Sequence, residues 1–416
     1  LTSYVSDNLR GDPGTTCVLK LERPTADSTY IPMELKITRG TIRTNPVPYY
    51  GMVDKNIGYI AISTFAIEGC SKDIKKALIE LKQQGATSIV LDLRGNGGGL
   101  LSEAVNVVNF FVPKGKEIVV TKGKIKQAGS TYKTSNEPID MEIPLTVLVD
   151  GATASAGEIV SGSLQDLDRA VIVGNRTYGK GLVQVPRELP YNSSMKVTTA
   201  KYYIPSGRCI QAIDYAKRNA DGSVARIPDS LTTVFHTAAG REVRDGGGIR
   251  PDVEVKAERF PNIMFYLLND DMIFDYATQY CIKHPNIGEV KDFSVTDADY
   301  DDFKQMLKKR NFTYDRQSEK SLKNLKEIAE FEGYMEGASE EFAALEKKLT
   351  HNLDHELNRF SKQIRKAIAE EIVKRHYFQR GVILERMKDD ADLTKAIETL
   401  KDKEGYTKIL SVPADK

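Results

Sequence analysis

The spacing of apolar residues changes twice along the chain. Between about residues 41 and 255, short apolar runs alternate with segments in which apolar residues recur every three or four positions. The runs Ser88–Asp92 and Leu145–Val149 are apolar almost throughout, which is typical of strands buried on both faces. Ile57–Phe65 predicts a further strand, and Ser71–Gln84 has helical spacing. Strands that alternate with helices predict an α/β core.

The two ends of the chain have different patterns. Residues 1–40 predict a short helix, Thr2–Leu9, and two strands, Thr16–Glu22 and Met33–Thr38, with too little apolar surface to fold alone. Beyond residue 256 the chain is highly charged and helical, and one apolar stripe predicts a long helix or a helix pair that serves as core or as a partner-facing surface. The stripe consists of Phe342, Leu345, Leu349, Leu353, Leu357, Phe360, Ile364, Ile368 and Ile372. We therefore predict three regions: 1–40, 41–255 and 256–416.

Composition narrows the classes of function only slightly. A chain of 416 residues predicts two or three domains. The net charge of +1 gives no reason to expect a nucleic acid or an anionic membrane as a partner. No apolar run reaches the roughly 20 residues that span a bilayer, and Leu1 is not followed by a signal-peptide pattern.

Neither the cysteines nor the histidines predict a metal site. The four cysteines, Cys17, Cys70, Cys209 and Cys281, are too scattered for a disulfide framework or a zinc motif. His351 and His355 have the i, i+4 spacing that can chelate a metal, but the glutamate that a zinc hydrolase would use after the first histidine is missing. We interpret them as a solvated helix face and predict no metal and no cofactor.

Ser155 is the first candidate for chemistry. It follows the buried strand Leu145–Val149 and a sharp turn, and it opens a helix, where unpaired N–H groups stabilise negative charge. Ser155 and Glu158 also fit the Ser-x-x-Glu capping box, which starts many helices for local reasons alone. The position is therefore consistent with a nucleophile and with a helix cap.

Lys180 makes the nucleophile interpretation stronger. It lies between Gly179 and Gly181, after the predicted strand Ala170–Val173. A lysine embedded among small residues loses stabilisation of its charge and can then act as a general base for a serine hydroxyl. Only one histidine, His236, lies near enough in the sequence for a Ser-His-Asp triad, so the lysine is the simpler base.

A glycine-rich loop supplies a third element of a site. Leu93–Gly99 runs from the strand Ser88–Asp92 to the predicted helix Ser102–Phe111. Successive glycines between a strand and a helix allow backbone N–H groups to converge on an anion, either a phosphate or an oxyanion. A flexible turn is the alternative.

A nucleotide-binding interpretation fits this chain poorly. Gly174–Lys180 matches the GxxxxGK pattern of a phosphate loop. However, Gly181 stands where a magnesium-binding Ser or Thr should follow, and Leu182–Pro186 predicts a strand rather than the helix that a phosphate loop opens.

Several motifs in a fixed order carry a resemblance to a known family. They are Asp92-Leu-Arg-Gly-Asn-Gly-Gly-Gly99, Thr153-Ala-Ser-Ala-Gly-Glu158, Gln165-Asp166, Arg169-Ala170, Gly174, Thr177-Tyr-Gly-Lys-Gly-Leu-Val-Gln184, Tyr203-Ile-Pro-Ser-Gly-Arg208 and Asp245-Gly-Gly-Gly-Ile249. Over roughly 57–253 the chain resembles the carboxy-terminal processing, or tail-specific, serine proteases. Residues 1–40 resemble the second half of a PDZ domain, so we expect a fragment cut within that domain.

The resemblance implies a crotonase-like (ClpP/crotonase) α/β core between the PDZ half and a helical C-terminal region. It implies Ser155 as nucleophile, Lys180 as general base and Gln184 as the residue that orients the lysine. The Ala156 N–H and the loop around Gly99 would form the oxyanion hole, with Gly98 as a near alternative.

The implied activity is that of a serine endopeptidase that cleaves proteins near an apolar C-terminal tail through an acyl-enzyme. The PDZ domain would engage that tail, and the compartment would be a bacterial cell envelope or periplasm. The alternative is a proteolytically silent scaffold or peptide-binding relative, in which the capping box only caps a helix and the C-terminal stripe recruits a partner. The sequence does not predict an oligomeric state.

Overall fold

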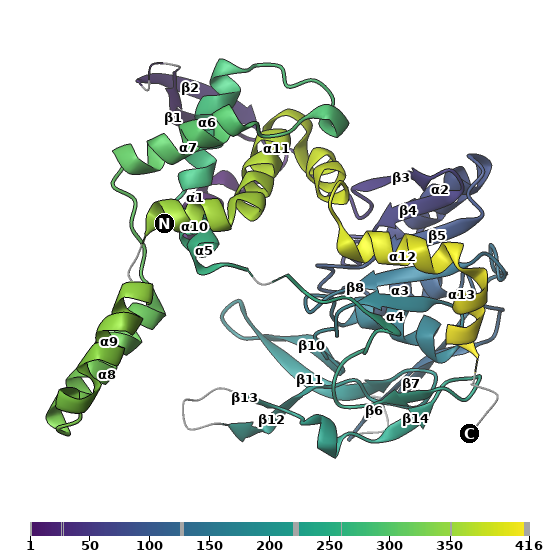
Figure 1. The fold of residues 1–416 in the computed structure, drawn as a ribbon. Coiled ribbons are helices and arrows are strands. Elements are labelled where there is room, and N and C mark those ends of the chain that lie inside the picture. Colours follow the sequence, from purple (N-terminus) through teal and green to yellow (C-terminus); the bar gives the residue numbers. More distant parts are fainter. Residues whose placement is uncertain are drawn as a thin grey trace. The chain divides into compact units, whose positions relative to one another are not determined.

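The chain forms two compact units in a computed structural model that describes residues 2–25, 27, 29–124, 129–218, 224–258, 260–349 and 352–411. Unit 1 combines residues up to 41 with 258–389, and unit 2 combines 42–257 with the C-terminal residues from 390 onward (Figure 1). The helical region predicted from residue 256 is thus shared between the units. The three-region division stays a prediction.

Unit 2 is built on a sheet of six strands in the order β16-β9-β8-β5-β4-β3. The strands are β3 (Tyr49–Asp54), β4 (Ile57–Ala61), β5 (Ser88–Asp92), β8 (Leu145–Val149), β9 (Val171–Gly174) and β16 (Val253–Glu254). All neighbours pair in parallel except β3, which is antiparallel to β4. The predicted buried strands β5 and β8 are confirmed with their bounds, whereas the strand predicted to reach Phe65 ends at Ala61 because the Ser63 N–H turns away to the Pro46 carbonyl.

Helices cover both faces of this sheet. Ile89 and Leu91 of β5 belong to one buried cluster with side chains of α2 (Cys70–Gln83), α3 (Leu101–Val108) and α4 (Ala156–Asp166). The intervening Val90 is also fully buried and so faces the opposite side. There α12 (Ala391–Lys401) packs across β5, β8 and β9, and α13 (Lys403–Leu410) packs against β9 (Figure 1). This layering confirms the predicted mixed α/β class.

A second, antiparallel sheet follows the order β10-β11-β6-β7. Its strands are β10 (Leu182–Leu189), β11 (Ser193–Tyr203), β6 (Glu117–Gly123) and β7 (Ser130–Lys133). β10 confirms that a strand, not a helix, follows Lys180 and Gly181, which argues against a phosphate loop. The smaller elements of unit 2 are β12 (Ile213–Arg218), β13 (Val224–Arg226), η2 (Asp229–Leu231), β14 (Val234–His236) and β15 (Glu242–Arg244).

Unit 1 contains an N-terminal hairpin and a set of helices. The predicted helix α1 (Thr2–Leu9) is confirmed, and the two predicted strands are present as the antiparallel pair β1 (Thr16–Pro24) and β2 (Tyr30–Thr38). The other elements are α5 (Asn262–Asn269), α6 (Met272–Lys283), η3 (Val290–Asp292), α7 (Asp297–Lys309), α8 (Gln317–Phe331), α9 (Met335–Leu349), α10 (Leu353–Arg359) and α11 (Ser361–Met387). Their core is apolar and rich in aromatic rings.

The prediction of one long helix or a helix pair for the apolar stripe was wrong. Its residues lie on the three helices α9, α10 and α11, except Phe360, which lies between α10 and α11. The Asn352 side chain accepts the His355 N–H at 3.0 Å and starts α10 anew. Leu357 and Ile368 are fully buried in the core of unit 1, whereas Leu345 on α9 is 42% exposed. The stripe is therefore not a single face.

Neither a metal cluster nor a membrane-spanning helix is found among the described residues. The described residues contain no cluster of three or more His, Cys, Asp or Glu side chains that could hold a metal ion, and His351 lies outside them. Within the same described ranges, no helix combines the length and the apolar character needed to cross a membrane.

Candidate active site

The fold gathers the candidate residues at one edge of the six-stranded sheet. The glycine loop follows β5, the Ser155 turn follows β8, and the segment that leads to Lys180 follows β9. These strands are parallel, so their carboxyl ends meet at the same edge, where α/β proteins commonly bind their ligands.

Ser155 occupies a strained turn between β8 and α4. Its φ of 56° and ψ of −116° lie outside the regions that side-chain-bearing residues prefer. A strained residue of this kind costs about 1–3 kcal/mol and persists only where its surroundings hold it. Part of that hold comes from Asp150, whose Oδ1 accepts the N–H groups of Ala152 and Thr153 and, from the glycine loop, of Gly95 at 3.0 Å.

Glu158 connects the serine segment to the lysine segment. Its carboxylate is completely buried, and Oε2 accepts the Ser155 N–H and the Lys180 N–H, both at 2.9 Å. Oε1 accepts the Gly179 N–H at 2.7 Å and the Thr177 hydroxyl at 2.5 Å. Burial raises the pKa of Glu158, and these four hydrogen bonds oppose the rise. The Glu158 half of the capping box is thus present, and the same carboxylate also reaches Lys180.

Tyr202 of β11 makes a second connection. Its hydroxyl donates to the Lys180 carbonyl and lies 3.3 Å from the Ser155 carbonyl. Burial, reinforced by Glu158, raises the pKa of Tyr202 well above its usual value, so the hydroxyl keeps its proton and remains a donor. The backbones of Ser155 and Lys180 are therefore held through their N–H groups by Glu158 and through their carbonyls by Tyr202.

The side chains of the proposed dyad are not joined in this structure. Among the described residues, no hydrogen bond links Ser155 Oγ with Lys180 Nζ, and both residues are half-buried. Gln184 is exposed at a bulge in the pairing of β10 with β11 and makes no hydrogen bond with Lys180 in the part of the chain described. The structure thus brings together the backbones of Ser155 and Lys180 and leaves Gln184 apart.

The glycine loop packs directly on the serine turn. The Asn96 carbonyl accepts the Ala154 N–H at 2.9 Å, and the Asn96 amide donates to the Ile62 carbonyl at 2.8 Å. Gly98 has a φ of 97°, and a Cβ added to it would lie 2.7 Å from the Cβ of Ser155. Only glycine fits this contact.

The three candidate oxyanion donors differ in whether their N–H groups are free. The Gly98 N–H already donates to Asn96 Oδ1 at 2.9 Å. For the N–H groups of Gly99 and Ala156, no acceptor is recorded among the residues that the structure describes. Gly99 and Ala156 are therefore better placed than Gly98 to donate to an oxyanion.

Sequence reasoning missed two residues that shape the site, Tyr202 and Asn96. Glu158 carried a signal, because its capping-box spacing marks it as a partner of Ser155. Tyr202 carried none, because its contact with Ser155 spans 47 positions and depends on how β11 packs.

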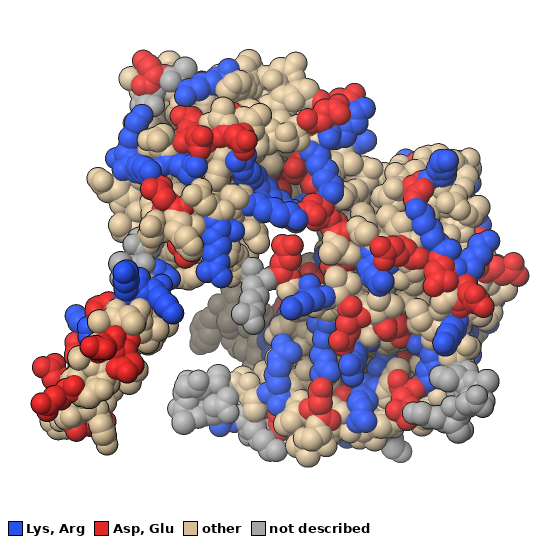
Figure 2. Space-filling model, in the orientation of Figure 1, with Lys and Arg blue, Asp and Glu red and all other residues tan. Residues whose placement is uncertain are grey.

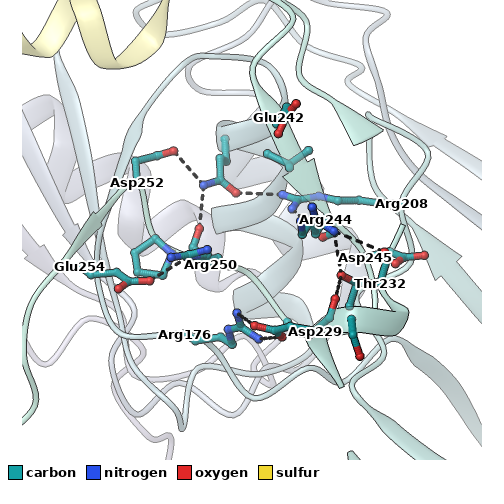
Figure 3. Close-up of a pocket in the computed structure, with 16 residues that line it drawn as sticks. Arg176, Arg208, Asp229, Thr232, Glu242, Arg244, Asp245, Arg250, Asp252 and Glu254 are labelled. Carbon is teal, nitrogen blue, oxygen red and sulfur yellow. Dashed lines mark hydrogen bonds and ion pairs between the residues drawn. The ribbon is translucent and has the colours of Figure 1, made fainter. Parts of the chain in front are cut away.

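A separate, highly charged cavity of about 930 Å³ lies in unit 2 (Figure 3). Three of its arginines are in ion pairs: Arg176 with Asp229 at 2.6 Å, Arg250 with Glu254 at 2.8 Å and Arg208 with Asp166 at 2.8 Å. Arg244 donates to the Thr232 hydroxyl at 3.3 Å. Arg208 reaches Gln165 at 2.9 Å. Neither Ser155 nor Lys180 lines the cavity, so we assign it no part in the proposed chemistry.

Comparison with protein families gives two matches along the chain. Residues 56–217 match the model of Peptidase family S41. Residues 263–400 match a model described as Probable PDZ-protease, C-terminal helical domain.

Individual relatives agree with these matches. A carboxy-terminal-processing protease of Bartonella bacilliformis is 38% identical over 213 residues, which are 50% of this chain and 47% of the relative. A carboxyl-terminal-processing protease of Picosynechococcus is 40% identical over 200 residues, 47% of this chain and 46% of the relative. The chain thus spans about half the length of the curated relatives it matches. A solved photosystem II D1 C-terminal processing protease is 30% identical, with a TM-score of 0.40 over 62% of this chain and 60% of that one.

Proposed function

We propose that this chain, which belongs to the carboxy-terminal processing proteases of peptidase family S41, is a serine endopeptidase that cleaves proteins near an apolar C-terminal tail. The relatives are named for processing at the carboxyl terminus, and we extend that activity to this chain. The observation that carries the proposal is the Glu158 carboxylate, which holds the backbones of Ser155 and Lys180 at one point.

The proposed chemistry uses a Ser155/Lys180 dyad. The Lys180 amine accepts the Ser155 Oγ proton while Oγ attacks the peptide carbonyl, and the proton then passes to the leaving amine. Water subsequently hydrolyses the acyl-enzyme. The N–H groups of Ala156 and Gly99, with Gly98 as the alternative, stabilise the oxyanion, and the loss of one such donor typically costs about 3 kcal/mol.

The missing hydrogen bond between the two side chains is compatible with this dyad. Because both backbone N–H groups reach the same Glu158 oxygen, the two nitrogen atoms lie no farther apart than twice 2.9 Å. Lysine carries a flexible four-carbon stem. We propose that rotation about that stem brings the amine to Ser155 Oγ without any movement of the backbone. Gln184 then orients the amine.

The flanking regions complete the proposal. We propose that the core has the crotonase-like fold and that β1 and β2 form part of the second half of a PDZ domain that receives the substrate tail. The exposure of Val18 (56%) and Ile31 (58%) on this hairpin supports an apolar surface available to further chain. By analogy with bacterial relatives, we propose the cell envelope or periplasm as the compartment.

The test is cleavage of an unfolded protein with an apolar C-terminus, compared with the same protein ending in charged residues. We expect Ser155→Ala and Lys180→Ala to abolish cleavage. Ser161→Ala, which removes a buried hydroxyl 3.0 Å from the Gly157 carbonyl on the same helix, is the matched control and should retain activity. Equal cleavage by parent, Ser155→Ala and Lys180→Ala would refute the dyad.

A silent scaffold or peptide-binding relative is the second candidate, and the open geometry between Ser155 and Lys180 favours it. A serine-reactive acylating probe separates the two. Labelling of Ser155 that disappears in Lys180→Ala supports the peptidase. Peptide binding without any labelling supports the scaffold.

A further inference from the structure

The α8–α9 hairpin of unit 1 is a well-defined pair of antiparallel helices. Gly333 has a φ of 81° at the turn, and the Tyr334 N–H donates back to the Ala329 carbonyl at 2.8 Å, so the turn is tight. Lys326 forms an ion pair with Glu346 at 2.8 Å, which joins the two helices along their length. The hairpin therefore presents a fixed surface.

This hairpin exposes more large apolar side chains than two helices can cover. No residue of α9 is buried, and on α8 only Leu322 and Ala329 are buried. The exposed set is Leu325 (51%), Ile328 (44%), Phe331 (93%), Tyr334 (68%) and Leu345 (42%). Grouped exposed apolar side chains mark interaction surfaces.

The charges on the hairpin are segregated along its axis. The outer part, residues 327–344, carries only acidic charge, and these residues are Glu327, Glu330, Glu332, Glu336, Glu340 and Glu341. The inner part, residues 316–326 and 345–349, is mainly basic. Three of its cations are in ion pairs within the chain, Arg316 with Glu319, Lys320 with Asp315 and Lys326 with Glu346. Lys323, Lys347 and Lys348 form no such ion pair within the described residues and make up the basic surface available to a second copy. Figure 2 shows the acidic side chains gathered on the outer part of the hairpin.

We propose that the α8–α9 hairpin is a self-association surface on which a second copy of this chain packs its own hairpin in the opposite direction. A twofold axis then brings the acidic outer part of each copy against the basic inner part of the other. The same contact between outer and inner part therefore forms at two places in the dimer. A parallel arrangement would place glutamates against glutamates. The product is a four-helix bundle that covers the exposed apolar residues.

The size of the hairpin surface determines how strongly two copies are expected to associate. A helix of 15 residues is about 22 Å long, so two such helices from each copy bury an area at the low end of specific interfaces. We therefore expect a reversible dimer that responds to salt, because exposed charge pairs are screened. The proposal does not depend on the proteolytic activity.

The test is sedimentation velocity of the whole chain from about 1 to about 100 µM, a range that brackets micromolar affinity. Two charge-reversed variants are compared: Glu332→Lys/Glu340→Lys in the outer part, and Lys323→Glu/Lys347→Glu in the inner part. No ion pair or side-chain hydrogen bond within the described residues involves these four side chains, so the hairpin itself should persist. Each variant alone should dimerise at least about tenfold more weakly than the parent, and an equimolar mixture should restore the dimer.

Two further variants serve as controls for the apolar contact and for nonspecific effects of charge. Leu325→Asp should abolish association even in the mixture, and Glu142→Lys/Glu188→Lys, which reverses two exposed acids of unit 2, should leave association unchanged. Circular dichroism verifies the helix content of every variant. Each of two outcomes would overturn the proposal: a parent that is monomeric at about 100 µM, or helical variants whose mixture does not dimerise.

Discussion

One buried carboxylate, Glu158, organises the strained turn at Ser155. A charged group in the interior is costly unless it is hydrogen-bonded, and Glu158 accepts four hydrogen bonds from two segments of the site, the Ser155 turn and Thr177–Lys180. Because two of these come from Ser155 and Lys180, the same bonds that stabilise the carboxylate fix the separation of the two backbones. Position, rather than proton transfer, is the role that this geometry supports.

Glu158→Gln should lower kcat about 100-fold while KM changes little. The amide of glutamine points its own N–H groups at some of the donors that now bind the carboxylate, and this displaces the backbones of Ser155 and Lys180. Steady-state kinetics on a peptide substrate measures this split. Glu142→Gln, at an exposed position, is the control and should leave kcat and KM unchanged. Full activity in the Glu158 variant would show that the carboxylate is not needed to position the dyad.

A second prediction concerns the contact between the glycine loop and the serine turn. In Gly98→Ala the new methyl meets Ser155 Cβ at 2.7 Å and the Ala154 carbonyl at 2.8 Å, at a φ that alanine rarely adopts. We expect a loss of about 1–3 kcal/mol of unfolding free energy from overpacking. Activity should fall about 100-fold because the nucleophile shifts.

Gly97→Ala is the matched control, because its added methyl meets no atom within 4 Å and its φ is not in the left-handed region. Thermal unfolding and cleavage rates should be near those of the parent. If the two alanine variants behave alike, the close contact at Gly98 does not constrain the site.

At the scale of elements, the sequence predicted correctly the strands that are buried on both faces. It did not predict features that depend on contacts with distant parts of the chain. β5 and β8 were predictable because strands covered on both faces must be apolar at consecutive positions. The stripe from Phe342 to Ile372 was misread because apolar spacing does not reveal the new start that Asn352 makes. Tyr202 and Asn96 could not be predicted, since their roles exist only once β11 and the glycine loop are placed.

The start of α2 shows how one element can cap another. Its N-cap is Gly69, which has no side chain to accept the free N–H groups of the first turn. Glu103 of α3 takes that place, and its carboxylate accepts the Gly69 N–H at 3.0 Å and the Ser71 N–H at 2.8 Å. Burial raises the pKa of Glu103, but the hydrogen bonds from Ser71 and Gly69 outweigh it and the net pKa is lowered.

Glu103→Gln should therefore lower the unfolding free energy by about 1.5–3 kcal/mol at neutral pH, the usual range for hydrogen bonds to a charged group. With a lowered folded pKa, this stabilisation is complete above the ordinary glutamate pKa of about 4.3 and is lost as the pH falls through the folded value. Denaturant unfolding of parent and variant across that range measures the difference. A difference that stays constant down to low pH would contradict the capping role.

At the scale of the whole molecule, the C-terminal helices return to unit 2. The guanidinium of Arg94, a residue of the glycine loop, pairs with Asp390 at 2.7 Å and with Asp392 at 3.1 Å. The Tyr406 hydroxyl donates to the Leu145 carbonyl at 3.1 Å, at the start of β8. The sequence did not indicate this return, because the charged, amphipathic α12 resembles the helices of unit 1 in composition.

Leu393→Ala, in the buried face of α12, should cost about 2–4 kcal/mol because it opens a cavity against the sheet. Hydrogen exchange locates the effect: amides of β5, β8 and β9, on which α12 packs, should exchange faster, while those of α10 and α11 in unit 1 should not change. Lys395→Ala, on the exposed side of the same helix, should change the unfolding free energy by no more than about 0.5 kcal/mol. Faster exchange in α10 and α11 would instead show that α12 stabilises both units, because a helix that belongs to unit 2 alone transmits its loss only to the strands that it covers.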